Sequence, residues 1–149
     1  MAYFSDPQTW IVVVTTLVVV MLCIGLHFEI LSHCRKILKR LSEHRRQRVL
    51  VLILIILLAH TVEIWMFAIG YVVTLEFFNG GELAGISMVS MLDYIYYSAM
   101  VYTTVGFGDV TPVGAIRFMT GVEALCGLVM ITWSASYTFL EMQRDWTKE

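Results

Sequence analysis

Charged residues and prolines are scarce in this chain of 149 residues. Only 15% of the residues are charged and two are proline, whereas 58% are hydrophobic. Soluble domains carry roughly 25% charged residues, so the composition argues against an ordinary water-soluble domain. The three cysteines, Cys23, Cys34 and Cys126, show no CxxC or other paired spacing. This scatter argues against a disulfide framework or a cysteine-based zinc site.

Motifs of enzymes and of voltage sensors are also missing. The sequence contains no phosphate-cradling loop and no nucleophile–base pair, so we expect no enzymatic activity, no cofactor and no nucleic-acid partner. No apolar segment carries arginines at three-residue intervals, which excludes a voltage sensor of that kind.

Three long apolar runs occupy most of the chain, at residues 10–31, 49–73 and 118–140. At about 1.5 Å per residue each run spans roughly 33 to 38 Å, enough to cross a hydrocarbon core of about 30 Å. We therefore predict an all-α, multi-pass integral membrane protein with three transmembrane helices. Residues 1–31 would form an N-terminal segment followed by the first helix.

Basic residues concentrate between the first two runs, in segment 32–48. The segment holds seven of the ten Lys and Arg residues: Arg35, Lys36, Lys39, Arg40, Arg45, Arg46 and Arg48. By the positive-inside rule this predicted loop is cytoplasmic, the N-terminus is outside, and the tail 143–149 is cytoplasmic. Apolar residues recur in it at helical spacing. Residues 35–48 would therefore lie on anionic lipid head groups or extend the neighbouring helices.

The segment between the second and third runs does not read as a simple loop. The stretch 79-NGGELAG-85 predicts a turn, and 90-SMLDYIYYSAMVY-102 predicts a helix that is too short to span. Ser90 and Asp93 form a capping-box pattern that places the start of this helix near Met91. Pro112 and Gly114 mark a second boundary. This order predicts a re-entrant loop, which a membrane tolerates only within protein or a water-filled cavity.

The stretch 103-TTVGFGD-109 resembles the selectivity filter of potassium channels. The likeness extends over residues 49–140 and implies an outer helix at 49–74, a pore helix at 91–103, a filter at 104–109 and an inner helix at 114–142. Because each chain carries one filter, the resemblance implies a homotetramer that conducts K⁺. The implied K⁺ ligands are the backbone carbonyls of Thr104, Val105, Gly106 and Phe107, with the Thr104 hydroxyl.

The physical requirement of such a filter explains its glycines. Successive carbonyls point to one axis only if alternate residues take opposed backbone conformations, which Gly106 and Gly108 adopt without steric cost. Phe107 stands where many family members have tyrosine. The residues that we expect to support the filter are Thr103, Gly108, Asp109 at the outer mouth, Tyr97, and Glu123 as a brace behind the pore helix. Gly127 is either a hinge of the inner helix or a close-packing small residue.

Ionisable residues within the spans suggest function by default, because they are costly there. His60 and Glu63 lie three residues apart in the second run. They could hydrogen-bond between helices, sense protons through His60, or form half of a metal site. The metal site would need further ligands, and we expect only Glu123 at matching depth. We predict that His27 and His33 are interfacial, and that Tyr3, Trp10 and Trp146 belong to an aromatic belt.

Three functions are consistent with this pattern. The first is a potassium-selective channel, which the intact TVGFGD favours. The second is a weakly selective cation channel of the same build, and the third is a non-conducting membrane assembly protein. The small chain and simple build are typical of a protein of the bacterial inner membrane.

Overall fold

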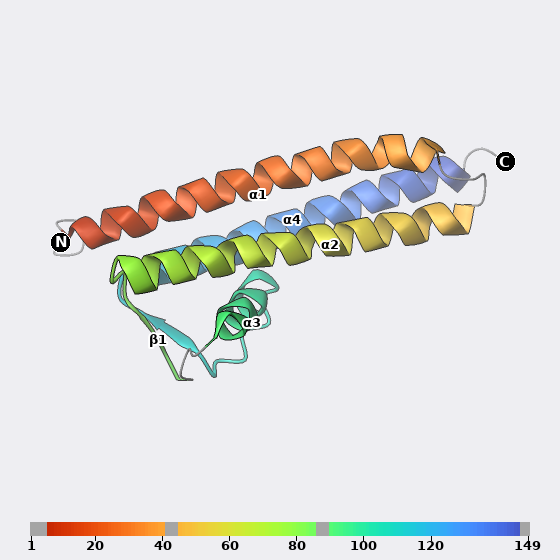
Figure 1. Ribbon diagram of the computed structural model, residues 1–149. Helices are drawn as coiled ribbons and strands as arrows, with labels where there is room; N and C mark the ends of the chain where they lie inside the picture. The colour runs from red at the N-terminus through yellow and green to blue at the C-terminus, as the bar shows by residue number, and fades with distance from the viewer. Residues whose placement is uncertain (1–5, 41–44, 86–89, 147–149) are drawn as a thin grey trace.

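Three long helices lie side by side in the computed structural model, which describes residues 6–40, 45–85 and 90–146 (Figure 1). They are α1 (Pro7–Arg40), α2 (Arg45–Val72) and α4 (Ile116–Trp146). Each contains a stretch that is long and apolar enough to cross a membrane. The predicted all-α architecture with three spans is therefore confirmed.

Helix α1 packs along both α2 and α4 with one face (Figure 1). Its buried residues recur every three or four positions, as expected for one face of a helix: Val12, Thr16, Val19, Cys23, His27, Leu31, Cys34 and Leu38. Its opposite face is apolar and open, and Met21 is 73% exposed there. Helix α1 therefore packs against the other long helices with one face and can contact lipid with the opposite face.

The prediction of a loop over residues 32–48 was wrong. Helix α1 continues to Arg40 and α2 begins at Arg45, so at most residues 41–44, which lie outside the described residues, can form a connection. The alternative, that this segment extends the neighbouring helices, is confirmed. The reason is that Lys, Arg, Leu and Gln are all good helix formers, so the positive charges end the apolar span without ending the helix.

The chain between α2 and α4 forms a small unit against one end of the long helices (Figure 1). Helix α2 passes into a π-helical turn, Val73–Phe77, which is followed by strand β1 (Glu82–Ala84), helix α3 (Met91–Tyr102) and strand β2 (Thr111–Val113). The strands pair antiparallel, with Leu83 opposite Pro112. A turn over the whole of 79–85 was therefore a wrong prediction, because its second half is paired in β1. The strand pair therefore holds together the two ends of the predicted re-entrant segment, which lies between β1 and β2.

The predicted limits of the helices differ from the observed ones by a few residues. Helix α3 ends one residue before the predicted end at 103, and α4 begins at Ile116 rather than 114 and continues past 142. Residues 143–146 of the predicted tail are thus helical. Trp10 is exposed near the start of α1, as a belt residue would be. Tyr3 and the side chain of Trp146 lie outside the described residues.

The start of α3 is fixed by the predicted capping box. Ser90 is the N-cap, and its backbone N–H donates to the Asp93 carboxylate at 2.8 Å. We expect Ser90→Ala to lower the free energy of unfolding by about 1 kcal/mol, because the contact of the Ser90 hydroxyl with the Asp93 carboxylate in the capping box is lost. Chemical unfolding of the purified protein in detergent measures this change. Ser136→Ala, at an exposed serine within α4, is the control, and equal effects of the two substitutions would contradict the capping role.

Candidate ion-conducting site

Helix α3 ends deep among the long helices, and the chain then turns back through residues 103–109. The backbone of Tyr102, the last residue of α3, lies directly against Gly127 of α4. A Cβ added to Gly127 would lie 2.0 Å from the Tyr102 carbonyl oxygen. Gly127 therefore acts as a close-packing residue here, the second of its two predicted roles, and its role as a hinge stays a prediction.

Residues 103–109, called the filter segment below because of their resemblance to a selectivity filter, alternate between left-handed and right-handed or extended backbone conformations. Thr104, Gly106 and Gly108 have positive φ angles of 59°, 51° and 80°, whereas the residues between them do not. This is the alternation that lets successive carbonyls point in one direction. Left-handed backbone was expected at the two glycines but not at Thr104, because threonine rarely adopts it. A non-glycine residue held in this conformation is typical of a functional segment.

Short hydrogen bonds fasten the filter segment to α3. The Gly106 N–H donates to the Met100 carbonyl at 3.1 Å, and the Thr103 hydroxyl donates to the Ala99 carbonyl at 2.7 Å. At the outer end, the Tyr96 hydroxyl donates to the Asp109 carboxylate at 2.7 Å. This bond raises the pKa of Tyr96, so the phenol stays protonated and keeps donating at neutral pH.

Glu123 lies behind α3, where the sequence predicted a brace. It is fully buried and accepts hydrogen bonds from the Ser98 hydroxyl of α3 at 2.5 Å and from the Tyr71 hydroxyl of α2. Tyr97 of α3 packs edge-on against Tyr71 at 5.0 Å and pairs with the Thr120 hydroxyl of α4 at 2.9 Å. One carboxylate thus connects three helices at the depth of α3, which suits the predicted brace.

We expect Glu123→Gln to loosen this connection without preventing folding. Both hydroxyl groups donate to the Glu123 carboxyl group, but a glutamine amide accepts on one side only, and leaving a buried donor without an acceptor costs about 1–3 kcal/mol. The substitution should lower the unfolding temperature and speed inactivation of any current. Thermal unfolding and current recordings measure these two effects. Glu141→Gln, near the C-terminal end of α4, is the control, and unchanged inactivation in Glu123→Gln would contradict the brace.

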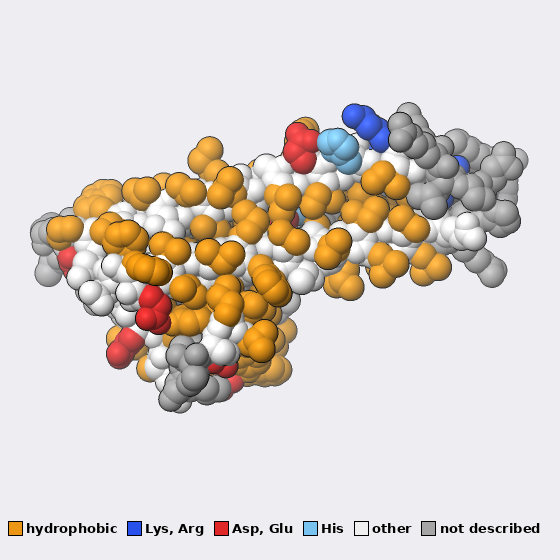
Figure 2. Space-filling view, viewed as in Figure 1, with side chains coloured by type: hydrophobic (Ala, Val, Ile, Leu, Met, Phe, Trp, Pro, Cys, Tyr) orange, Lys and Arg blue, Asp and Glu red, His pale blue; other side chains and the backbone are white. Residues whose placement is uncertain are grey.

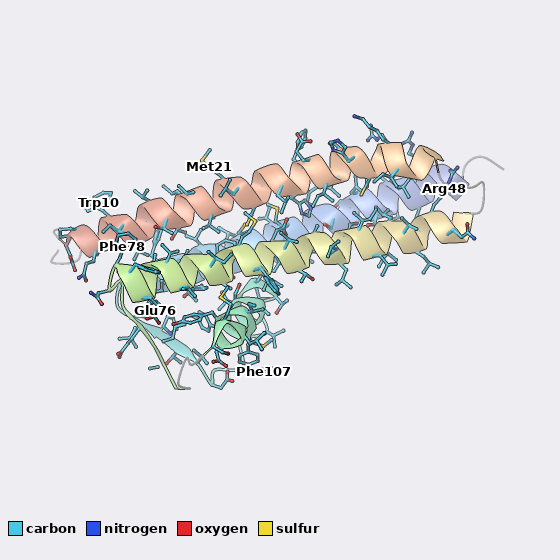
Figure 3. The ribbon with its side chains drawn as sticks, in the orientation of Figure 1. Trp10, Met21, Arg48, Glu76, Phe78 and Phe107 are labelled. Carbon is cyan, nitrogen blue, oxygen red and sulfur yellow. The ribbon has the colours of Figure 1, made fainter. Side chains whose placement is uncertain are left out.

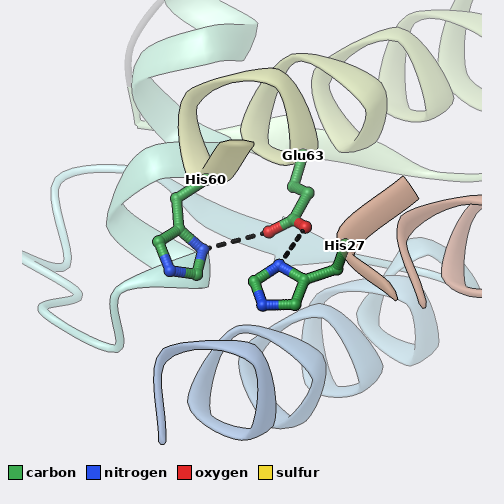
Figure 4. Close-up of side chains that lie close together, drawn as sticks. All are labelled: His27, His60 and Glu63. Atoms are coloured by element: carbon green, nitrogen blue, oxygen red, sulfur yellow. Dashed lines mark hydrogen bonds and ion pairs between the residues drawn. The ribbon is translucent and has the colours of Figure 1, made fainter. Parts of the chain in front are cut away.

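A second buried cluster joins α1 to α2 (Figure 4). Nδ1 of His27 lies 2.8 Å from Oε1 of Glu63, and Nδ1 of His60 lies 3.0 Å from Oε2. The Tyr102 hydroxyl also donates to the Glu63 carboxylate. His27 and Glu63 are completely buried, so the prediction of an interfacial His27 was wrong. Helix α1 continues well beyond His27, which places this residue inside the helix bundle instead of at its end.

The predicted pairing of His60 with Glu63 is therefore present, and His27 is the member that the sequence missed. Its position four residues after Cys23, on the face that repeats every three or four residues, was the available signal. His33, by contrast, is exposed as expected, with 60% of its side chain accessible.

Comparison with known proteins decides the class of this site. The model of the family described as "Ion channel" matches residues 49–144, which include α2, the re-entrant segment and nearly all of α4. The chain belongs to the ion channel family. The filter segment, Glu123, His60 and Glu63 all lie within the matched region, whereas α1 and His27 precede it.

Two curated relatives match parts of the chain. Protein LctB of Geobacillus stearothermophilus is 38% identical over 61 residues, which cover 41% of this chain and 46% of LctB. Protein LctB of Bacillus caldotenax is 47% identical over 38 residues, which cover 26% of this chain and 28% of the relative. The chain thus spans less than half the length of the curated relatives it matches. No solved structure matches it significantly.

The family match and the three long apolar helices together indicate an integral membrane protein of the ion channel family. The family match also indicates a transport protein rather than an enzyme. The matched region includes the part of the chain between α2 and α4. The backbone alternation at residues 104–108 distinguishes one segment in that region.

Proposed function

We propose that the protein is a potassium-selective channel whose filter is formed by the TVGFGD segment. The observation that carries this proposal is the left-handed backbone at every second residue, Thr104, Gly106 and Gly108. A row of carbonyls that share one direction can replace the hydration shell of a dehydrated K⁺ ion. The ligands are the carbonyls of Thr104, Val105, Gly106 and Phe107, together with the Thr104 hydroxyl.

We propose further that the working unit is a homotetramer. All seven residues from 103 to 109 are exposed in the single chain, and Phe107 is 70% exposed (Figure 3). Polar backbone cannot remain uncovered in a membrane, so neighbouring copies must surround it. Four chains around one axis would cover the segment and supply equivalent carbonyls. Phe107 and Val105 would then pack between the filter and the α3 helices of the ring. Phe107 stands where many potassium channels have tyrosine.

The distribution of charge supports one orientation. Figure 2 shows Lys and Arg side chains near the ends of α1 and α2 that flank residues 41–44, and acidic side chains near the strand pair at the other end. Basic residues favour the cytoplasmic side, so we propose that the filter opens to the outside of a bacterial inner membrane. Asp109 of each chain would then form an acidic ring that concentrates cations. The basic ends would contact anionic lipids.

Ion flux through the purified protein in liposomes tests this function. We expect K⁺ flux that greatly exceeds Na⁺ flux and that is blocked by Ba²⁺. Equal K⁺ and Na⁺ fluxes would indicate the weakly selective cation channel instead. The absence of flux under any condition would indicate the non-conducting assembly protein.

A further inference from the structure

We propose that His27, His60 and Glu63 form a binding site for a divalent transition-metal ion such as Zn²⁺. One ligand atom of each residue lies within 4.8 Å of the ligand atoms of the other two (Figure 4). Two histidines and one glutamate are a donor set that binds Zn²⁺ in proteins, where a fourth position is left for another ligand. The sequence left a metal site short of ligands, with only Glu123 expected at matching depth, and the structure adds His27 from α1.

The distances require only a small rearrangement. Two tetrahedral ligand atoms with bonds of about 2.0 Å to zinc are about 3.3 Å apart. Nδ1 of His27 lies 2.8 Å from Oε1 of Glu63 and Nδ1 of His60 lies 3.0 Å from Oε2, each within about half an ångström of that separation, and the three ligand atoms lie within 4.8 Å of one another. The rings of His27 and His60 already lie close, with their centroids 5.3 Å apart.

His27 also has the outer partner that a metal-bound histidine requires. The Ser134 hydroxyl of α4 lies 3.0 Å from Nε2 of His27, on the side of the ring opposite Glu63. When Nδ1 binds the metal, Nε2 carries the proton and donates a hydrogen bond to the Ser134 hydroxyl, which can accept as well as donate. Such outer hydrogen bonds fix the ring orientation and the tautomer of ligating histidines.

A candidate fourth ligand and a surface groove lie next to the cluster. The Tyr102 hydroxyl lies 3.0 Å from Nδ1 of His60 and contacts Glu63, so it or a water molecule can complete the tetrahedron. A groove of about 490 Å³ between α2 and α4 is lined by both His60 and Ser134 and is open at the surface. The groove brings His60 and Ser134 to the surface of the chain, among side chains that are otherwise mostly apolar.

The charge of the cluster also favours a cation. The Glu63 carboxylate is fully buried, and the partners that the structure shows for it are His27, His60 and Tyr102, of which only a protonated histidine would carry a positive charge. A buried carboxylate is costly in a membrane without a compensating charge. A metal ion supplies that charge and ties α1 and α2 to Tyr102, immediately before the filter segment.

Metal titration of the purified full-length protein tests the site. The protein is stripped with a chelator in detergent and titrated with ZnCl₂ by calorimetry, and Co²⁺ replaces Zn²⁺ in a second sample for absorption spectroscopy. We expect one Zn²⁺ per chain, an increase in unfolding temperature on binding, and the strong visible absorption of tetrahedral Co²⁺. None of these measurements depends on ion conduction, so a failed flux experiment leaves this result interpretable.

Three variants decide whether the metal binds at this cluster. His27→Gln should abolish binding, and Ser134→Ala should weaken it about 10–100-fold because the outer partner of His27 is lost. His33→Gln, at an exposed histidine of the same helix, is the matched control and should bind as the wild type does. If His27→Gln does not fold, the affinity of Ser134→Ala decides. No binding by the wild type, or equal affinity in Ser134→Ala and His33→Gln, would overturn the proposal and leave the cluster as a hydrogen-bonded connection.

Discussion

Gly106→Ala should abolish K⁺-selective conduction while the long helices still form. Gly106 has a φ of 51°, which L-residues other than glycine adopt at a cost of about 1 kcal/mol or more. This cost recurs in all four chains of the proposed ring, so the alternating backbone should give way and its carbonyls should lose their common direction. Liposome flux of K⁺ and Na⁺ and the circular dichroism of the same sample measure the two effects.

Gly121→Ala is the matched control for this substitution. An added Cβ meets nothing within 4 Å in the chain at either glycine, but Gly121 lies in α4 and has no positive φ. The two variants therefore differ in backbone conformation and not in available space. Normal K⁺ selectivity in Gly106→Ala would contradict the assignment of the filter.

Gly127→Ala should disrupt the contact between α3 and α4. The new Cβ would lie 2.0 Å from the carbonyl oxygen of Tyr102, and backbone cannot move aside as a flexible side chain does. Overpacking of this kind costs about 3 kcal/mol at the upper end of the usual range. We expect a lower unfolding temperature and loss of the assembled oligomer, measured by thermal unfolding and by size-exclusion chromatography in detergent.

Gly121→Ala serves again as the control, since it adds the same methyl group to the same helix where there is room for it. If Gly127→Ala and Gly121→Ala unfold at the same temperature, the close approach of Tyr102 to Gly127 does not matter for stability. A normally stable Gly127→Ala with altered opening would support the hinge instead.

The long helices and the start of α3 could be predicted from the sequence because the responsible signals are local. Apolar runs define the spans, and Ser90 with Asp93 defines one helix start. The motif TVGFGD distinguished residues 104–109 in the sequence, but the left-handed backbone of Thr104 could not be predicted from it. That conformation depends on the hydrogen bonds between the segment and the end of α3, which no local propensity reports.

The role of His27 could not be predicted because it depends on how α1 packs. A histidine in an apolar run can face lipid, the end of the membrane or a neighbouring helix, and only the position of α1 against α2 and α4 distinguishes these places. The helical ends of α1 and α2 could not be distinguished from a loop for a different reason. Their charges indicate the side of the membrane but say little about backbone conformation.

The reversal potential of single channels with K⁺ on one side of a bilayer and Na⁺ on the other tests the central claim most directly. A tenfold preference for K⁺ over Na⁺ corresponds to about 1.4 kcal/mol. Moving a unit charge across 100 mV corresponds to about 2.3 kcal/mol, so each tenfold preference displaces the reversal potential by about 59 mV. A potassium-selective filter predicts a displacement of at least about 59 mV toward the K⁺ equilibrium potential. A reversal near 0 mV, with clear current, would contradict the account.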